Sequence, residues 1–231
     1  MAPKHNTCSH ASTVSKEDGR RIAWKMPRSI IKKTIGQCIK TALLAKEANY
    51  DGVELDACRQ RLLNSFATPG LNTRQDDWGE TSENRYRLAL EIVKGIRQRA
   101  GEEFLIGARI SLLDFHRFGK SWEETVRFAR DLEKVGVNYF TFDFGVDYMP
   151  IPTTHGLTPE DAWVPFIEMF RKEVSVPIVF GDNLSTPKLI NEILGNNPHT
   201  CVELARPLIV DHGWVKKILY RMHKMQSRMH G

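Results

Sequence analysis

The sequence predicts an α/β fold built around a parallel β-sheet. Short apolar segments alternate along the chain with longer segments in which apolar residues recur every three or four positions, the spacing of a helix packed on one side. The apolar segments are near-continuous, which is typical of parallel strands buried on both faces. With 231 residues, the chain is long enough to bury the core that such a sheet needs.

The first predicted elements are a polar segment, a long helix and a short strand. Residues 1–27 are polar, mixed in charge and weakly periodic, so we expect an N-terminal loop segment. Apolar positions at helical spacing predict a helix over residues 29–49. The short apolar run at 52–55 then predicts the first strand of the sheet.

Four more strands are predicted, at 104–111, 137–144, 176–181 and 201–205. A doubly wound open sheet needs only five or six strands, whereas a (β/α)8 barrel needs eight strands and about 250 residues, so the strand count favours the open sheet. No glycine-rich phosphate loop of the dinucleotide or P-loop type follows any of these strands, which weakens that choice. The residues themselves leave both architectures open.

The helices between these strands are predicted from their periodicity and their start signals. They cover 84–100, a segment beginning at 121, 158–172, a segment beginning at 186, and 214–229. Ser121 with Glu124 forms the pattern of a capping box. Threonine followed by proline, at 158–159 and at 186–187, is the pattern of an N-cap with proline at the first helical position.

The longest predicted loop, from Asp56 to Glu83, follows the first strand. Loops of this length in a compact domain are usually functional. This one begins with Asp56, Cys58, Arg59 and Arg61, so charged and nucleophilic side chains gather where a buried strand ends. We therefore expect a candidate site at this edge of the sheet.

Composition excludes several classes of protein. The net charge of +5 suits a phosphate-bearing ligand as well as nucleic acid, but no zinc-finger, RRM or basic-region pattern is present, so no nucleic-acid partner is expected. The four cysteines are scattered without a CxxC pair, so neither a metal site nor a disulfide framework is expected. No apolar run approaches the ~20 residues of a membrane span and no signal peptide is evident, so we expect a cytoplasmic protein without a membrane partner.

A longer motif over residues 72–85 identifies a family. The pattern N-x-R-x-D-x-W/Y-G-x-x-x-x-N-R is present as Asn72, Arg74, Asp76, Trp78, Gly79, Asn84 and Arg85. Together with YDGVEL before it, and VPIVFGDNLSTPKLINEIL and ELARPLIVD after it, this motif resembles the Old Yellow Enzyme family of NADH:flavin oxidoreductases. The nearest branch is that of 2,4-dienoyl-CoA reductase and trimethylamine dehydrogenase.

The resemblance implies a TIM barrel in place of an open sheet. The five strands match strands 4–8 of a (β/α)8 barrel, so residues 28–231 are expected to form an incomplete flavin oxidoreductase barrel that lacks the first three strands. An open barrel segment has two edges with unpaired backbone groups. A second copy in a homo-oligomer, or a partner chain that completes the barrel, is therefore expected.

The resemblance also implies FMN at the carboxyl ends of the strands. The positions that match the phosphate-binding loops are Gly181, Asp182, Asn183, Ala205 and Arg206. The Asp182 carboxylate either repels a phosphate there or caps the next helix and points away. Arg109 matches the arginine that touches the flavin, and Glu54 is its alternative partner in a structural ion pair.

The catalytic positions depart from the family pattern. Asp56, Arg59 and Arg61 stand where relatives have a substrate-orienting pair and a proton-donating tyrosine. Arginine stays protonated near neutrality and is a poor general acid. Two interpretations remain open: the site has decayed, or Arg59 and Arg61 bind an acidic substrate in an altered site.

The implied activity is that of an FMN-dependent NAD(P)H oxidoreductase of the ene-reductase or dienoyl-CoA reductase type, truncated and with substituted catalytic residues. Hydride would pass from NAD(P)H through FMN to an enone or acyl-CoA substrate. No iron–sulfur cluster is expected, because the cysteines that hold it in that branch lie beyond the barrel. The alternatives are a non-catalytic remnant that acts as an interaction or barrel-completing partner and, more remotely, a lyase or isomerase that uses Asp56.

Overall fold

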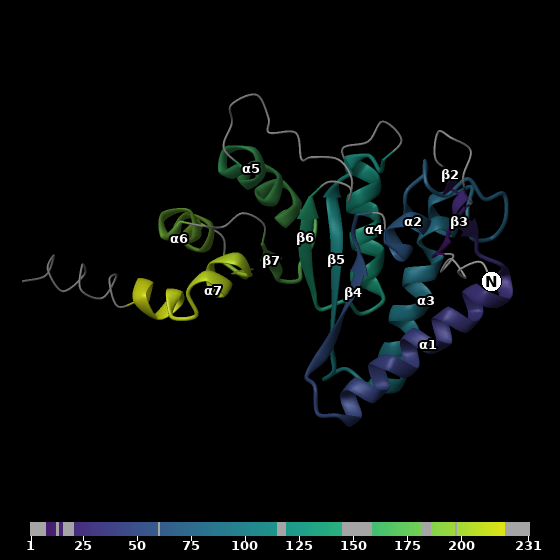
Figure 1. Ribbon diagram of the computed structural model, residues 1–231, viewed down its shortest axis with the longest axis horizontal. Helices are drawn as coiled ribbons and strands as arrows, with labels where there is room; N and C mark the ends of the chain where they lie inside the picture. The colour runs from purple at the N-terminus through teal and green to yellow at the C-terminus, as the bar shows by residue number, and fades with distance from the viewer. Residues whose placement is uncertain are drawn as a thin grey trace, which may run out of the picture.

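A five-stranded parallel sheet forms the centre of the molecule (Figure 1). The computed structural model describes residues 8–12, 14–15, 21–59, 61–114, 119–144, 159–181, 186–196 and 198–219. The strands of the sheet are β4 (Gly52–Ala57), β5 (Leu105–Leu113), β6 (Tyr139–Phe144), β7 (Ile178–Phe180) and β8 (Thr200–Val202).

Each strand of this sheet pairs in parallel with the next strand along the chain, in the order β4-β5-β6-β7-β8. A doubly wound sheet reverses its order of succession at a switch point, whereas a barrel does not. The preference of the strand count for an open doubly wound sheet is therefore wrong. The five strands follow one another as consecutive strands of a barrel do.

Seven labelled helices and one further helical segment accompany the strands in the described part of the chain. They are α1 (Arg28–Glu47), α2 (Leu62–Ala67), α3 (Ser82–Ala100), α4 (Trp122–Lys134), α5 (Pro159–Arg171), α6 (Pro187–Asn196) and α7 (Arg206–Val210). The predicted capping box of Ser121 and Glu124 starts α4. Residues 214–219 are also helical, and the rest of the helix predicted over 214–229 lies outside the described residues. The short helices α2 and α7 were not predicted, because five or six residues are too few to show a period.

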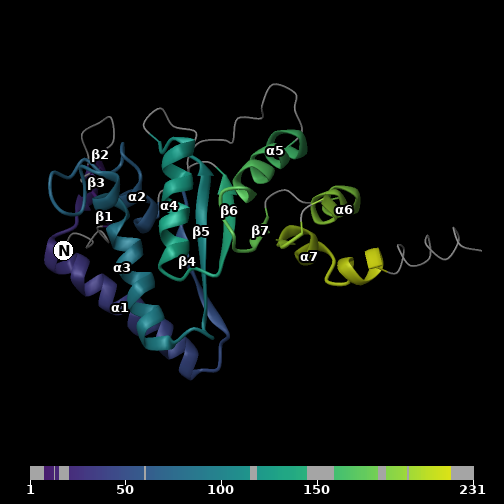
Figure 2. The same cartoon turned by 180° about the vertical axis from the view of Figure 1, so that it is seen from behind.

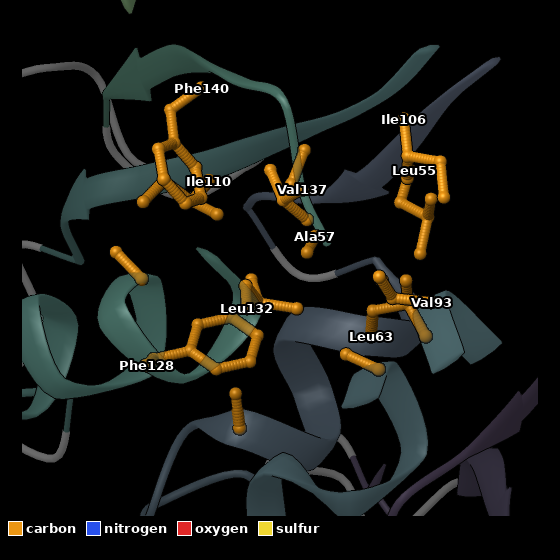
Figure 3. Packing of buried hydrophobic residues seen from close by; sticks show 14 of the residues in the cluster. Leu55, Ala57, Leu63, Val93, Ile106, Ile110, Phe128, Leu132, Val137 and Phe140 are labelled. Carbon is orange, nitrogen blue, oxygen red and sulfur yellow. The ribbon is translucent and has the colours of Figure 1, made fainter. Parts of the chain in front are cut away.

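The core lies between one face of the sheet and helices α2, α3 and α4. Leu55, Ala57, Ile106, Ile110 and Phe140 point from β4, β5 and β6 toward these helices (Figure 3). Viewed from behind, α4 and α3 again lie alongside the strands, with α1 packed on α3 (Figure 2). Alternation along the strands sends the intervening side chains to the opposite face.

We call this opposite side the inner face and define it by Glu54 and Asp56 of β4, Arg109 of β5, Tyr139 and Thr141 of β6, and Glu203 just after β8. In β4 the buried and exposed positions alternate, so the expectation of strands buried on both faces is wrong for this strand. A polar inner face explains why: its side chains pair with each other rather than with a second apolar layer.

A small second sheet forms where the sequence predicts a loop. Its strands are β1 (Cys8–His10), β2 (Val14–Ser15) and β3 (Arg21–Lys25), in the order β1-β3-β2. Periodicity does not show these strands because they are short and are held by distant residues. Ala11 N donates to Ser65 Oγ at 3.3 Å, and Thr73 N donates to Ser12 Oγ at 2.8 Å.

Arg74 of the family motif ties this N-terminal segment to the long loop. Its side chain is 1% exposed, and it forms a two-point ion pair with Asp76 at 2.9 and 2.8 Å. The remaining guanidinium nitrogen, Nη1, donates to the carbonyls of Ala11 at 3.0 Å and Met26 at 2.8 Å. One buried arginine therefore joins residues up to 63 positions apart.

Asn72 and Gly79 of the same motif shape the loop around Arg74. Asn72 Nδ2 donates to the carbonyls of Phe66 at 2.8 Å and Trp78 at 2.7 Å. A Cβ atom at Gly79 would lie 2.5 Å from Arg74 Cβ, so a larger residue there would force Arg74 to move. The most recognisable family motif in this chain is thus a scaffold for the loop. Among the described helices, none is long and apolar enough to cross a membrane.

Candidate active site

Arg109 is the centre of the inner face. Its Nε donates to Glu54 Oε1 at 2.9 Å, and its two terminal nitrogens bind the two oxygens of Glu203 at 2.7 and 2.6 Å. Thr141 Oγ1 donates to the other oxygen of Glu54 at 2.5 Å. Sequence reasoning named Glu54 as the alternative to a flavin as the partner of Arg109, and the structure shows that Arg109 contacts Glu54. It missed Glu203, since no local pattern links residues 94 positions apart.

The contact between Arg109 and Glu203 shows how strongly the sheet curls. The two residues come from β5 and from the end of β8, with β6 and β7 between them. Adjacent strands are about 4.8 Å apart, so three steps would cover about 14 Å along a flat sheet. Side chains on the inner face converge over such a separation when the sheet bends, as it does in a barrel.

Glycines make room for two of the inner-face side chains. A Cβ atom at Gly181 would lie 2.2 Å from Glu203 Oε1 and 2.3 Å from its Cγ. A Cβ atom at Gly107 would lie 2.2 Å from the Tyr139 ring. The absence of a side chain at Gly181 therefore allows the Glu203 carboxylate to reach Arg109.

Arg109 stands between the carboxylates of Glu54 and Glu203, so the charges of these three residues sum to minus one. Hydrogen bonding to Glu203, followed by the charges of Glu54 and Glu203, raises the pKa of the Arg109 guanidinium despite its partial burial. Burial and then the Glu54 charge raise the pKa of the Tyr139 hydroxyl. The guanidinium is thus permanently charged, and the phenol stays neutral at physiological pH.

Two of the three predicted catalytic residues lie together at the end of β4. Arg61 Nε lies 3.8 Å from Asp56 Oδ2, and both side chains are about half exposed. Asp56 Oδ1 also accepts from the Cys58 backbone amide at 3.4 Å and from the Cys58 thiol at 3.1 Å. In the β4–β5 register Asp56 is opposite Arg109, so the Asp56–Arg61 pair lies on the inner face next to that arginine.

Arg59, the third predicted catalytic residue, is held by its backbone. Its φ is 50°, a left-handed conformation that is uncommon outside glycine. The Arg59 amide donates to Ser111 Oγ at 2.7 Å, and its carbonyl accepts from Asn64 Nδ2. The loop after β4 is therefore anchored to β5 and α2 at a strained position, a feature that often marks functional sites.

A buried polar cluster below this loop was not predicted. Lys120 and Asp114 form an ion pair at 2.8 Å with side chains 1% and 2% exposed. Lys120 Nζ also donates to Asn64 Oδ1 at 2.5 Å and to Thr68 Oγ1 at 3.3 Å. Burial alone would raise the pKa of the Asp114 carboxyl, but the charge and hydrogen bonds of Lys120 lower it. The only sequence signal was two opposite charges flanking a short loop.

The predicted cofactor positions lie at the carboxyl ends of neighbouring strands. Gly181 directly follows β7, and Ala205 and Arg206 follow β8 at the start of α7. Asp182 and Asn183 lie outside the described residues. A permanent cation on the inner face and a small residue at the end of β7 fit a flavin in kind and placement. Glu203 does not fit a flavin, because its carboxylate already accepts the hydrogen bonds of both terminal nitrogens of Arg109.

Comparison with known proteins agrees with this geometry. The profile of the NADH:flavin oxidoreductase / NADH oxidase family matches residues 2–224. An NADH oxidase of Thermoanaerobacter brockii is 30% identical over 221 residues, which are 94% of this chain and 32% of that protein. An NADPH dehydrogenase of Geobacillus sp. (strain WCH70) is 29% identical over 219 residues, 89% of this chain and 63% of that protein. The chain thus spans less than two thirds of either relative.

Solved structures with the same fold include a 2-naphthoyl-CoA reductase in complex with 2-naphthoyl-CoA. It has a TM-score of 0.84 and 24% identity, and the match covers 92% of this chain and 33% of that chain. A morphinone reductase in complex with tetrahydroNAD has a TM-score of 0.71 and 22% identity over 93% of this chain and 60% of its own. These likenesses confirm that the five strands form part of a barrel fold. On the profile match over nearly its whole length, the chain belongs to the NADH:flavin oxidoreductase / NADH oxidase family.

Proposed function

We propose that this chain supplies strands 4–8 of an FMN-dependent NAD(P)H oxidoreductase barrel that reduces an activated alkene in a small enone or acyl-CoA substrate. The observation that carries the proposal is the position of Arg109. It is a permanent cation at the centre of the inner face, beside Asp56 in the register and within reach of the ends of β7 and β8. Family membership supplies the class of reaction.

In this proposal, FMN, when bound, supplies the hydride acceptor and donor between NAD(P)H and the substrate. Arg109 binds and orients the flavin ring from the inner face. Backbone groups at Gly181, Ala205 and Arg206, with Asp182 and Asn183, hold the phosphate. These residues only bind and orient, and none of them transfers a proton.

The substrate is bound by the loop after β4. Arg61 is half exposed and paired with Asp56 at 3.8 Å, so its guanidinium is accessible to a substrate oxygen. Arginine holds its protons near neutrality, so Arg61 polarises a carbonyl or binds a carboxylate rather than donating a proton. The proton that completes alkene reduction then comes from solvent. This assignment favours a substrate with an anionic group close to the alkene.

The test is a titration of the purified chain with FMN, followed by NADH and NADPH oxidation assays with an enone and an enoyl-CoA. The expected results are visible flavin absorbance that co-elutes with protein, and substrate-dependent NAD(P)H consumption. Arg109→Gln should weaken flavin binding at least tenfold. Arg130→Gln on α4 is the matched control. It alters the partly exposed ion pair of Arg130 with Glu173 and should leave FMN binding unchanged. Protein that neither retains nor binds FMN would contradict the proposal.

A specific observation favours a second function, that of a barrel-completing partner. Ile209 and Val210 of α7 are 83% and 87% exposed, and Leu219 in the next helical segment is 57% exposed. Large exposed apolar patches are typical of an interface. Both helical segments follow β8 in the chain, and β8 is one edge of the sheet within the described residues. Light scattering tests this function: a monomer that stays monomeric at high concentration and with FMN would exclude a second copy as the partner.

A further inference from the structure

We infer that Glu203 is an internal ligand of Arg109 that competes with the flavin and sets the affinity of the inner face for it. This inference rests on the proposed function, because it assigns Arg109 to the flavin. In this inference Glu203 opposes flavin binding, whereas the other residues assigned to the site favour it.

Backbone pairing fixes the position of Glu203. Its amide donates to the Phe180 carbonyl at 2.8 Å, which extends the pairing of β7 and β8 by one residue. The side chain is therefore directed onto the inner face by the sheet itself. From there both carboxylate oxygens bind the terminal nitrogens of Arg109 at 2.7 and 2.6 Å. Two-point contacts between guanidinium and carboxylate are among the strongest hydrogen bonds in proteins.

The space around this contact suits the carboxylate closely. A Cβ atom at Gly181 would lie within 2.3 Å of two atoms of the Glu203 side chain, so Glu203 fills the volume that glycine leaves open. Glu54 binds Nε of the same guanidinium at 2.9 Å. Arg109 therefore has carboxylate partners at all three of its nitrogens.

A flavin needs the donors that Glu203 holds. The pyrimidine part of the flavin ring presents two carbonyl oxygens and one unprotonated ring nitrogen, which accept hydrogen bonds. With Glu203 in place, such a ligand must displace a two-point ion pair before it reaches Arg109, and it meets a face with a net negative charge. Removing the Glu203 charge weakens its hold on two nitrogens of Arg109, while Glu54 still binds the third.

The experiment compares FMN dissociation constants, measured by quenching of flavin fluorescence, for three forms of the full chain. Glu203→Gln keeps the size of the side chain and removes its charge, and we expect it to tighten FMN binding at least tenfold. Glu192→Gln on α6 removes an exposed carboxylate paired only loosely with Lys188 at 3.9 Å, and we expect a change of less than twofold. Thermal unfolding of each variant shows that it is folded.

The outcomes separate this inference from the proposed function. Tighter binding in Glu203→Gln supports the inference, also where the unmodified chain binds FMN only weakly. Unchanged or weaker binding in that variant, beside measurable binding by the unmodified chain, overturns the inference and leaves the function standing. Absence of binding in every form overturns both. If Glu203→Gln does not fold, Glu203→Ser replaces it, and failure of both to fold overturns the inference by making Glu203 a structural residue.

Discussion

Replacing Arg74 with methionine should strongly destabilise this protein, although Arg74 lies outside the inner face. Arg74 is 1% exposed and gives two hydrogen bonds to Asp76 and one each to the carbonyls of Ala11 and Met26. Methionine fills most of the volume but leaves two carbonyls without the donor that Arg74 supplies. The Asp76 carboxylate, which is 17% exposed, keeps only the Trp78 amide at 3.1 Å and the exposed Arg28 at 3.8 Å.

The size of the effect follows from the burial of the pair. Removing one partner of a buried ion pair costs about 3–5 kcal/mol, because the other charge remains without compensation. A domain is stable by only about 5–15 kcal/mol, so this loss is a large fraction of the total. For a chain of this length it corresponds to a fall in melting temperature of about 6–20 °C. Urea unfolding followed by tryptophan fluorescence measures it, since Trp78 lies in the affected loop.

The chain offers a matched control in Arg127, whose pair with Glu83 is exposed, at 52% and 60% for the two side chains. Arg127→Gln should cost less than about 1 kcal/mol, as exposed pairs usually do. A double variant that also replaces Asp76 with leucine should recover part of the loss. If Arg74→Met lowers the free energy of unfolding no more than Arg127→Gln does, the prediction is wrong, because Arg74 would then not hold the N-terminal segment in place.

Three further predictions concern the residues around the site. Lys120→Met should leave the Asp114 carboxylate buried without its cation, and so lower the free energy of unfolding in urea by about 3–5 kcal/mol. A cost below about 1 kcal/mol would contradict this and show that water reaches the cluster. Because the folded pKa of Asp114 lies below the unfolded value of about 3.9, its stabilisation is complete above that pH and is lost as the pH falls through the folded pKa. Urea midpoints measured from neutral to acid pH should therefore fall less steeply for Asp114→Asn than for the unmodified chain, and parallel curves would contradict this. Gly181→Ala should force the Glu203 side chain away from Arg109 and lower the free energy of unfolding by about 1–3 kcal/mol. In a double-mutant cycle, the same Gly181→Ala change should cost much less when Glu203 has been replaced with serine.

Much of the fold could be predicted from the sequence because the relevant signals are local. Apolar spacing located α1 and α3 to within two residues at each end, and Ser121 with Glu124 marked the start of α4. The residues of the family motif identified the barrel against the strand count. In each case the information lies within one element or one continuous loop.

The sequence could not predict contacts between residues far apart in the chain. β1, β2 and β3 depend on Arg74, Ser65 and Thr73, so their polar residues carry no sign of the sheet they form. The sequence also gives no sign of the buried ion pair of Lys120 and Asp114, because the same two residues in an exposed loop would have the same spacing.

The sequence by itself determined the family and most of the order of the elements, and it placed the charged residues Asp56, Arg59 and Arg61 where the first strand of the parallel sheet ends. Only the tertiary structure decided what those charges contact. The curled sheet brings Glu203 across three strands to Arg109, and the ion pair of Asp56 with Arg61 lies beside them. The sequence shows which side chains are charged, but the partner of each charge depends on where the backbone places both groups. For Arg109 that partner is Glu203, 94 positions further along the chain.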